Sequence, residues 1–85
     1  MYVYNFISPN ASEEDTDLFF GPLNENEQFI LIQPTWIMAH VMHAAECFKS
    51  ISQARKNGWD KPIPSGFSMY VVGKRKAQIY ILNLQ

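Results

Sequence analysis

Aromatic and β-branched residues gather in four short stretches of the chain, and each stretch predicts a β-strand. Residues 1–7 would place Val3 and Ile7 on one face and Tyr4 and Phe6 on the other. Residues 28–33 form a short apolar run that Pro34 ends. Residues 67–72 and 77–84 follow later, separated by a glycine-containing basic turn. We therefore predict two separate strands and a C-terminal β-hairpin.

A helical period of apolar residues predicts one main helix over residues 36–48, which contain neither glycine nor proline. Thr35 could cap its start. A spacing of 100° per residue stacks Ile37, Val41, Ala44 and Phe48 on one face, which we expect to meet the core.

Two further capping signals predict shorter helices. Ser12 precedes a run of acidic residues, which favours a helical turn that ends before Gly21. Ser50 and Gln53 have the spacing of a capping box and predict a second short helix through Asn57, with Gly58 just after its end.

These elements predict an α+β fold over a single domain, residues 1–85, because so short a chain has room for one core. The simplest packing is a small antiparallel sheet of about three to four strands, including the hairpin, with one main helix and a short second helix on one face. So small a sheet leaves a strand edge exposed, and edge pairing would allow a homodimer.

The composition indicates a folded cytoplasmic protein, since 47% of the residues are hydrophobic and 14% aromatic. The single cysteine, Cys47, allows no intrachain disulfide, which is typical of a reducing compartment. The most apolar stretch, residues 36–48, is too short to span a membrane, and the first residues lack the pattern of a signal peptide.

Charge is distributed unevenly along the chain, although the net charge is only −1. Residues 1–48 contain seven of the eight acids and no base, for a charge of −7, whereas residues 49–85 contain all seven bases and one acid, for +6. Such asymmetry suggests a charged partner, unless folding brings the two halves together and cancels the field.

The basic half supports our leading hypothesis, binding of a nucleic acid or a nucleotide through its phosphates. A helix start, a linker and a hairpin tip could together form one positive surface. Its residues would be Lys49, Ser50, Ser52, Arg55, Lys56, Lys61, Lys74, Arg75 and Lys76. Three aromatic residues lie among them in the sequence and could stack on bases, namely Trp59, Phe67 and Tyr70. Lysines at a hairpin tip are also ordinary surface residues.

Two fragments of this half resemble parts of the S4 RNA-binding domain. Residues 50–56 are similar to the serine-capped helix of that family, and residues 72–76 to its later basic strand. The resemblance covers about a dozen residues, and the family's hairpin between the two parts is missing, so we assign no family. It implies an RNA-type ligand and makes Arg55 and Lys56 the first residues to test.

One side of the main helix carries His40, His43 and Cys47. Zinc binds these residue types, but a structural site needs four ligands and the chain has no further His or Cys, so we predict no metal. Cys47 and His43 could form a thiolate–imidazole pair, yet no oxyanion-hole signal accompanies them. Nucleotide-binding and hydrolase motifs are absent from the sequence, so we predict no cofactor and lean against an enzyme.

The acidic half supports the alternative hypothesis, a small inhibitor or adaptor of the kind that viruses and mobile elements encode. An acidic surface flanked by aromatic residues can dock on a basic protein. The residues would be Glu13, Glu14, Asp15, Asp17, Phe19 and Phe20, with an exposed sheet edge as a second route. The ordinary interpretation of this stretch is a solvated surface.

Overall fold

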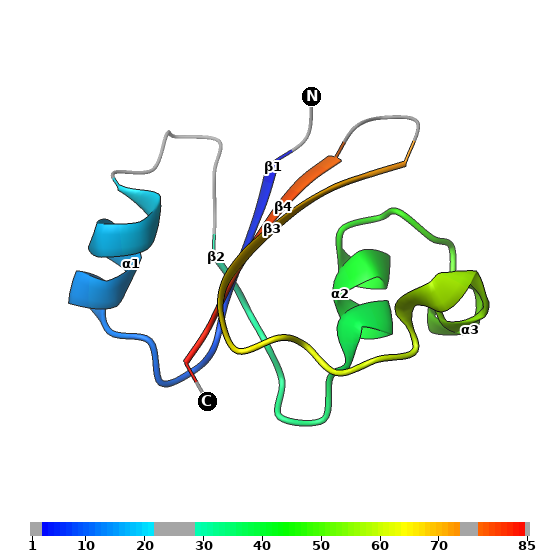
Figure 1. The fold of residues 1–85 in the computed structure, drawn as a ribbon, viewed down its shortest axis with the longest axis horizontal. Coiled ribbons are helices and arrows are strands. Elements are labelled where there is room, and N and C mark those ends of the chain that lie inside the picture. Colours follow the sequence, from blue (N-terminus) through cyan, green and yellow to red (C-terminus); the bar gives the residue numbers. More distant parts are fainter. Residues whose placement is uncertain (1–2, 22–28, 74–76, 85) are drawn as a thin grey trace.

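The computed structural model describes residues 3–21, 29–73 and 77–84. Four strands form one sheet in the order β2-β1-β4-β3, with α1 on one face and α2 and α3 on the other (Figure 1). The α+β class is therefore confirmed. The main helix and the second short helix share one face as predicted, whereas α1 packs on the opposite face of the sheet through Phe20.

The first half of the chain folds as β1 (Val3–Ile7), α1 (Glu13–Phe20) and β2 (Phe29–Leu31). Ser12 caps α1 as predicted: its Oγ accepts the Asp15 N–H at 3.1 Å, while the Asp15 carboxylate accepts the Ser12 N–H at 2.9 Å. The helix ends at Gly21, whose φ of 67° suits glycine. After this crossover, β2 returns parallel to β1.

The main helix, α2 (Met38–Ala44), is shorter than the predicted range. It begins at Met38, with Ile37 rather than Thr35 as the N-cap residue, and Nδ1 of His40 accepts the Ile37 N–H at 3.0 Å, the part that Glu or Gln plays in a capping box. It ends at Ala44, and Glu46, two residues later, adopts a left-handed φ of 61°. The buried face is accordingly centred one residue away from the predicted stripe, on Met38, Ala39, Val41 and Met42.

The second short helix, α3 (Ile51–Ala54), continues into a wider turn, η1 (Arg55–Trp59). Ser50 caps it as predicted, accepting the Gln53 N–H at 3.1 Å. Gly58, with a φ of 96°, ends the turn as predicted. Residues 60–65 then run without regular structure to the hairpin.

The C-terminal hairpin consists of β3 (Gly66–Val72) and β4 (Ala77–Asn83), paired antiparallel as predicted. Residues 74–76 of its tip lie outside the described residues. The sheet is mixed rather than wholly antiparallel, because β4 enters the centre and runs parallel to β1. A helical connection on each side of β2 allows these parallel pairings.

The hydrophobic core lies between the sheet and α2–α3. Phe6 of β1 and Ile79 and Ile81 of β4 are fully buried there against Met38 and Met42 of α2. Partly buried residues close the rim of this core, among them Trp36, Ile51, Trp59 and Tyr70. Within the described residues, none of the helices has the length and apolar character needed to cross a membrane.

Candidate functional sites

The predicted basic residues lie on the α2–α3 side of the sheet, as far as the structure describes them. Lys49, Lys56 and Lys61 are exposed, and so is Ser52. Arg55 is engaged, since its Nε lies 3.2 Å from Oδ1 of Asp60. The Oγ of Ser50 is occupied by the cap of α3. Lys74, Arg75 and Lys76 lie outside the described residues, so their union with the other bases stays a prediction.

Two of the three predicted stacking residues are brought together. The rings of Trp59 and Tyr70 meet edge to face with their centroids 5.7 Å apart, and the Lys61 ammonium lies 5.0 Å from the Trp59 ring centroid. Phe67 lies on the other face of the sheet, because it is an odd number of residues from Tyr70 along β3 and strand side chains alternate. It therefore belongs to a different surface from Trp59.

The acidic residues gather on α1, across the sheet from the bases (Figure 1). Glu13, Glu14 and Asp17 are exposed. Hydrogen bonds from the Ser12 backbone and hydroxyl hold the pKa of Asp15 below its ordinary value, so this carboxylate serves the helix cap. Among the described residues, the four acids of α1 and the four bases therefore lie on opposite faces of the sheet, while Glu46 and Asp60 lie on the basic side.

Exposed apolar side chains of α1 and of the outward face of β3 form what we name the α1–β3 surface: Leu18 and Phe19 of α1 with Phe67, Met69 and Val71 of β3. Phe19 stacks on Phe67 with ring centroids 5.4 Å apart, which joins the helix to the strand. Between 39% and 78% of each of the five residues is exposed. The sequence prediction included Phe19 but missed Met69 and Val71, because both alternating faces of β3 are apolar and the pattern alone could not show which is covered.

Phe20, the last predicted acidic-half residue, is half-buried and anchors α1 to the sheet. Its ring meets those of Phe29, Phe67 and Tyr80 edge to face, at centroid distances of 5.2, 5.4 and 6.5 Å. Thr16 is the buried residue of α1, and its hydroxyl donates to the Glu13 carbonyl at 2.9 Å. Phe20 therefore has a structural role, whereas Phe19 remains available at the surface.

His40, His43 and Cys47 have separate hydrogen-bond partners. His40 caps α2 and stacks on Trp36, with ring centroids 6.0 Å apart. Nδ1 of His43 donates to the Phe48 carbonyl at 3.0 Å, and Sγ of Cys47 lies 3.8 Å from the Ala45 carbonyl oxygen. Burial raises the pKa of the Cys47 thiol, which disfavours the reactive thiolate. No group of three metal-ligating side chains occurs in the described part of the chain.

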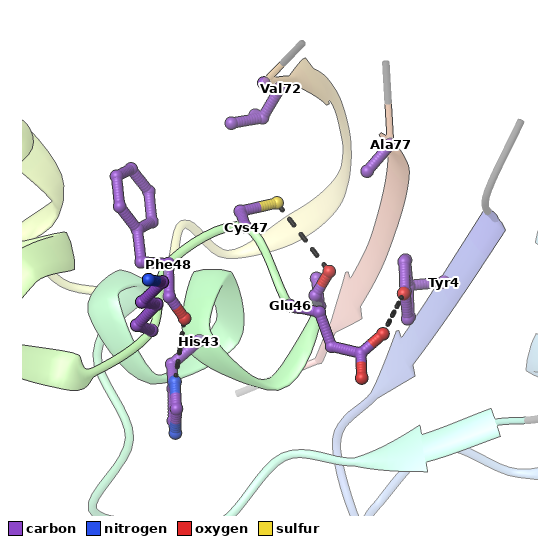
Figure 2. Close-up of a pocket in the computed structure, with 10 residues that line it drawn as sticks. Tyr4, His43, Glu46, Cys47, Phe48, Val72 and Ala77 are labelled. Carbon is purple, nitrogen blue, oxygen red and sulfur yellow. Dashed lines mark hydrogen bonds between the residues drawn. The ribbon is translucent and has the colours of Figure 1, made fainter. Parts of the chain in front are cut away.

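A cleft opens where the segment after α2 faces the start of β1 and the base of the hairpin. It encloses about 550 Å³ and is lined by Tyr4, His43, Ala45, Glu46, Cys47, Phe48, Lys49, Val72, Gly73 and Ala77. Figure 2 shows the Glu46 side chain extending toward Tyr4, whose hydroxyl donates to the Glu46 carboxylate at 3.0 Å. The imidazole of His43 points away from Cys47 (Figure 2), so the geometry gives no nucleophile–base pair.

The structure thus presents three separate features: a basic side with Trp59, an acidic and apolar α1–β3 surface, and the cleft. The cleft was not predicted, since its residues come from three distant parts of the sequence and only the fold joins them. Comparisons with protein-family models, with curated proteins and with solved structures found no match to this chain.

Proposed function

We propose that the chain is a non-enzymatic module that binds another protein through the α1–β3 surface. The observation that carries this proposal is the exposure of Leu18, Phe19, Phe67, Met69 and Val71 around one stacked aromatic contact. Adjoining exposed apolar side chains of this size mark interaction sites on folded proteins. They are costly to leave in water, and a partner would bury them.

The position of β3 suggests how the partner binds. Among the described residues, β3 is an edge strand that pairs with β4 alone, so the backbone groups on its outer side could accept another strand. An extended segment could add to this edge and place alternate apolar side chains on Met69 and Val71. Glu13, Glu14 and Asp17 are exposed on α1, which covers part of the same face of the sheet, so a partner that also extends over α1 would carry lysine or arginine.

The test is a selection of displayed peptides on the purified protein, followed by affinity measurements on variants. We expect selected peptides that combine basic and alternating apolar residues. Met69→Glu should weaken their binding at least about tenfold, because it places an unpaired charge in the contact. Glu13→Gln/Glu14→Gln/Asp17→Asn should weaken it less and reduce its salt dependence.

Lys56→Glu is the matched control, since Lys56 is exposed on the other side of the sheet. Peptides that bind Met69→Glu as well as the original chain would contradict the proposal. Sedimentation of the unmodified protein identifies one special partner: self-association that Met69→Glu abolishes would mean that a second copy occupies the β3 edge.

A second candidate function is binding of a phosphate-rich ligand, a nucleic acid or nucleotide, through the opposite side. It is favoured by exposed Lys49 and Lys56 together with Lys61 held over Trp59. RNA and DNA oligonucleotides titrated in salt test it, because affinity for phosphates falls linearly on a log–log plot. Arg55→Glu/Lys56→Glu should abolish this binding. Absence of binding at low salt would contradict this candidate and leave the α1–β3 surface unaffected.

A further inference from the structure

Glu46, at the cleft, occupies the left-handed position just after α2, where glycine is the usual residue. The Cys47 N–H donates to the Met42 carbonyl at 3.0 Å, and the Glu46 N–H donates to the His43 carbonyl at 2.9 Å. These two bonds close the end of α2, and Glu46 is the left-handed residue of the closure. Glycine is usual there, because other side chains are strained at a φ near the observed 61°. A carboxylate is also disfavoured by the negative end of the helix dipole.

Strain of this kind is often found where a side chain serves a function. Glu46 is the non-glycine residue with positive φ in the described part of the chain, and its carboxylate lines the cleft. The Tyr4 hydroxyl donates a hydrogen bond of 3.0 Å to one oxygen of the Glu46 carboxylate and so orients it. The fold thus accepts a locally unfavourable residue that presents a held negative charge at the cleft.

A positive charge lines the same cleft without neutralising this carboxylate. Lys49 follows Glu46 by three residues, yet the ion pair found among the described residues joins Arg55 to Asp60 instead. The rest of the lining is mainly apolar, with Phe48, Val72 and Ala77. A carboxylate accepts hydrogen bonds and an ammonium donates them, so a ligand that satisfies both carries a donor group and an acceptor group.

We propose that this cleft binds a small zwitterionic molecule with an apolar or aromatic body, in the manner of an amino acid. Its ammonium group contacts the Glu46 carboxylate, its carboxylate contacts the Lys49 ammonium, and its body packs on the apolar lining. The cleft volume of about 550 Å³ falls within the range of small-molecule sites. This inference is independent of the proposed function, since the α1–β3 surface lies on the other face of the sheet.

The experiment follows backbone amide NMR signals of the ¹⁵N-labelled chain during titration with three matched probes. L-tryptophan carries both charges, tryptamine lacks the carboxylate, and indole-3-propionate lacks the ammonium. We expect L-tryptophan to bind best, at concentrations up to about 10 mM, as is common for fragment-sized ligands. Signals of residues 45–49 and of Val72 should move, and each single-charge probe should bind roughly tenfold more weakly.

Two variants assign the charges. Glu46→Gln should weaken L-tryptophan to the affinity of indole-3-propionate, and Lys49→Gln should weaken it to that of tryptamine. Lys56→Gln, an exposed lysine outside the cleft, should leave all three affinities unchanged. The proposal is overturned if no probe moves the cleft signals, or if the three probes bind equally and ignore both cleft substitutions.

Discussion

The two faces of the sheet differ in how completely they are covered. On the α2–α3 face, Phe6, Ile79 and Ile81 are fully buried beneath Met38 and Met42. On the other face, the eight residues of α1 leave Met69 and Val71 more than half exposed. One layer therefore supplies most of the hydrophobic stabilisation, which grows with the apolar area removed from water.

Each face of the sheet also contains an unpaired buried polar atom. Nδ2 of Asn5, on the α1 face, and Oδ1 of Asn83, on the α2–α3 face, have no hydrogen-bond partner among the described residues. Leaving a buried donor or acceptor unpaired costs about 1–3 kcal/mol. A face that contributes little to stability can retain exposed apolar residues for recognition, and the difference in coverage is the physical basis for placing the protein-binding surface there.

The largest expected effect contrasts one apolar residue from each face. Phe6→Ala should lower the free energy of unfolding by about 3–5 kcal/mol, because it removes a fully buried ring and leaves a cavity. Met69→Ala should change it by less than about 0.5 kcal/mol, since more than half of Met69 is already in water. Urea unfolding followed by circular dichroism measures both.

The same two variants can also refute the difference between the two faces of the sheet. A Met69→Ala loss as large as that of Phe6→Ala would mean that β3 is covered on both faces in solution. The cover could come from the chain itself or from a second copy, and dilution separates these two cases. A loss of stability that depends on protein concentration would indicate a dimer that covers Met69.

The next effect concerns the cap that holds α1. Ser12→Ala removes the hydroxyl that accepts the Asp15 N–H and should destabilise α1 by about 1 kcal/mol. If the α1 face is the weaker one, amide hydrogen exchange should quicken in α1 and remain slow in β1 and β4. Equal acceleration throughout the chain would show instead that α1 unfolds only with the whole domain.

Glu46 lies on the α2–α3 side of the sheet, and its substitution by glycine should increase stability rather than decrease it. Glu46→Gly relieves the left-handed strain and removes a negative charge from the end of α2, so it should raise stability by roughly 0.5–1 kcal/mol. Glu46→Gln keeps the strain and should gain less. Thermal unfolding of the two variants measures the difference, and a loss of stability in Glu46→Gly would show that the bond from Tyr4 outweighs the strain.

Local signals in the sequence predicted the elements well because their causes are local. Ser12 and Ser50 cap helices where expected, and Gly58 has the positive φ that its position requires. The start of α2 was missed because no capping hydroxyl marks it, and the imidazole of His40 takes the part that Glu or Gln usually plays in a capping box. Capping by an imidazole has no common sequence signature, so the helix was predicted two residues too early.

The arrangement of the elements was harder to predict, because it depends on contacts between distant residues. The pairing of β4 with β1 joins the two ends of the chain, and no short pattern encodes it. The fold also brings Tyr4 of β1 to Glu46, while the alternation of side chains along β3 separates Phe67 from Trp59. The members of each charged set were therefore predictable from sequence, while the surfaces and the cleft that they form required the fold.

The smallest effect is a pH dependence of α1 alone. The pKa of Asp15 is lowered mainly by the hydrogen bond from the Ser12 backbone N–H and further by the Ser12 hydroxyl, so the folded state favours the ionised carboxylate. The contribution of Asp15 to stability is thus fully present at neutral pH and is lost as the pH falls through its lowered pKa.

The carboxyl carbon signal of Asp15 should titrate below the ordinary range for aspartate. Ser12→Ala should raise the midpoint only in part, since the hydrogen bond from the backbone remains. Asp15→Asn should remove the acid sensitivity of α1 while leaving the α2–α3 face unchanged. An ordinary midpoint for Asp15 would mean that the capping box is open in solution and that the aromatic contacts of Phe19 and Phe20, rather than the cap, hold α1 in place.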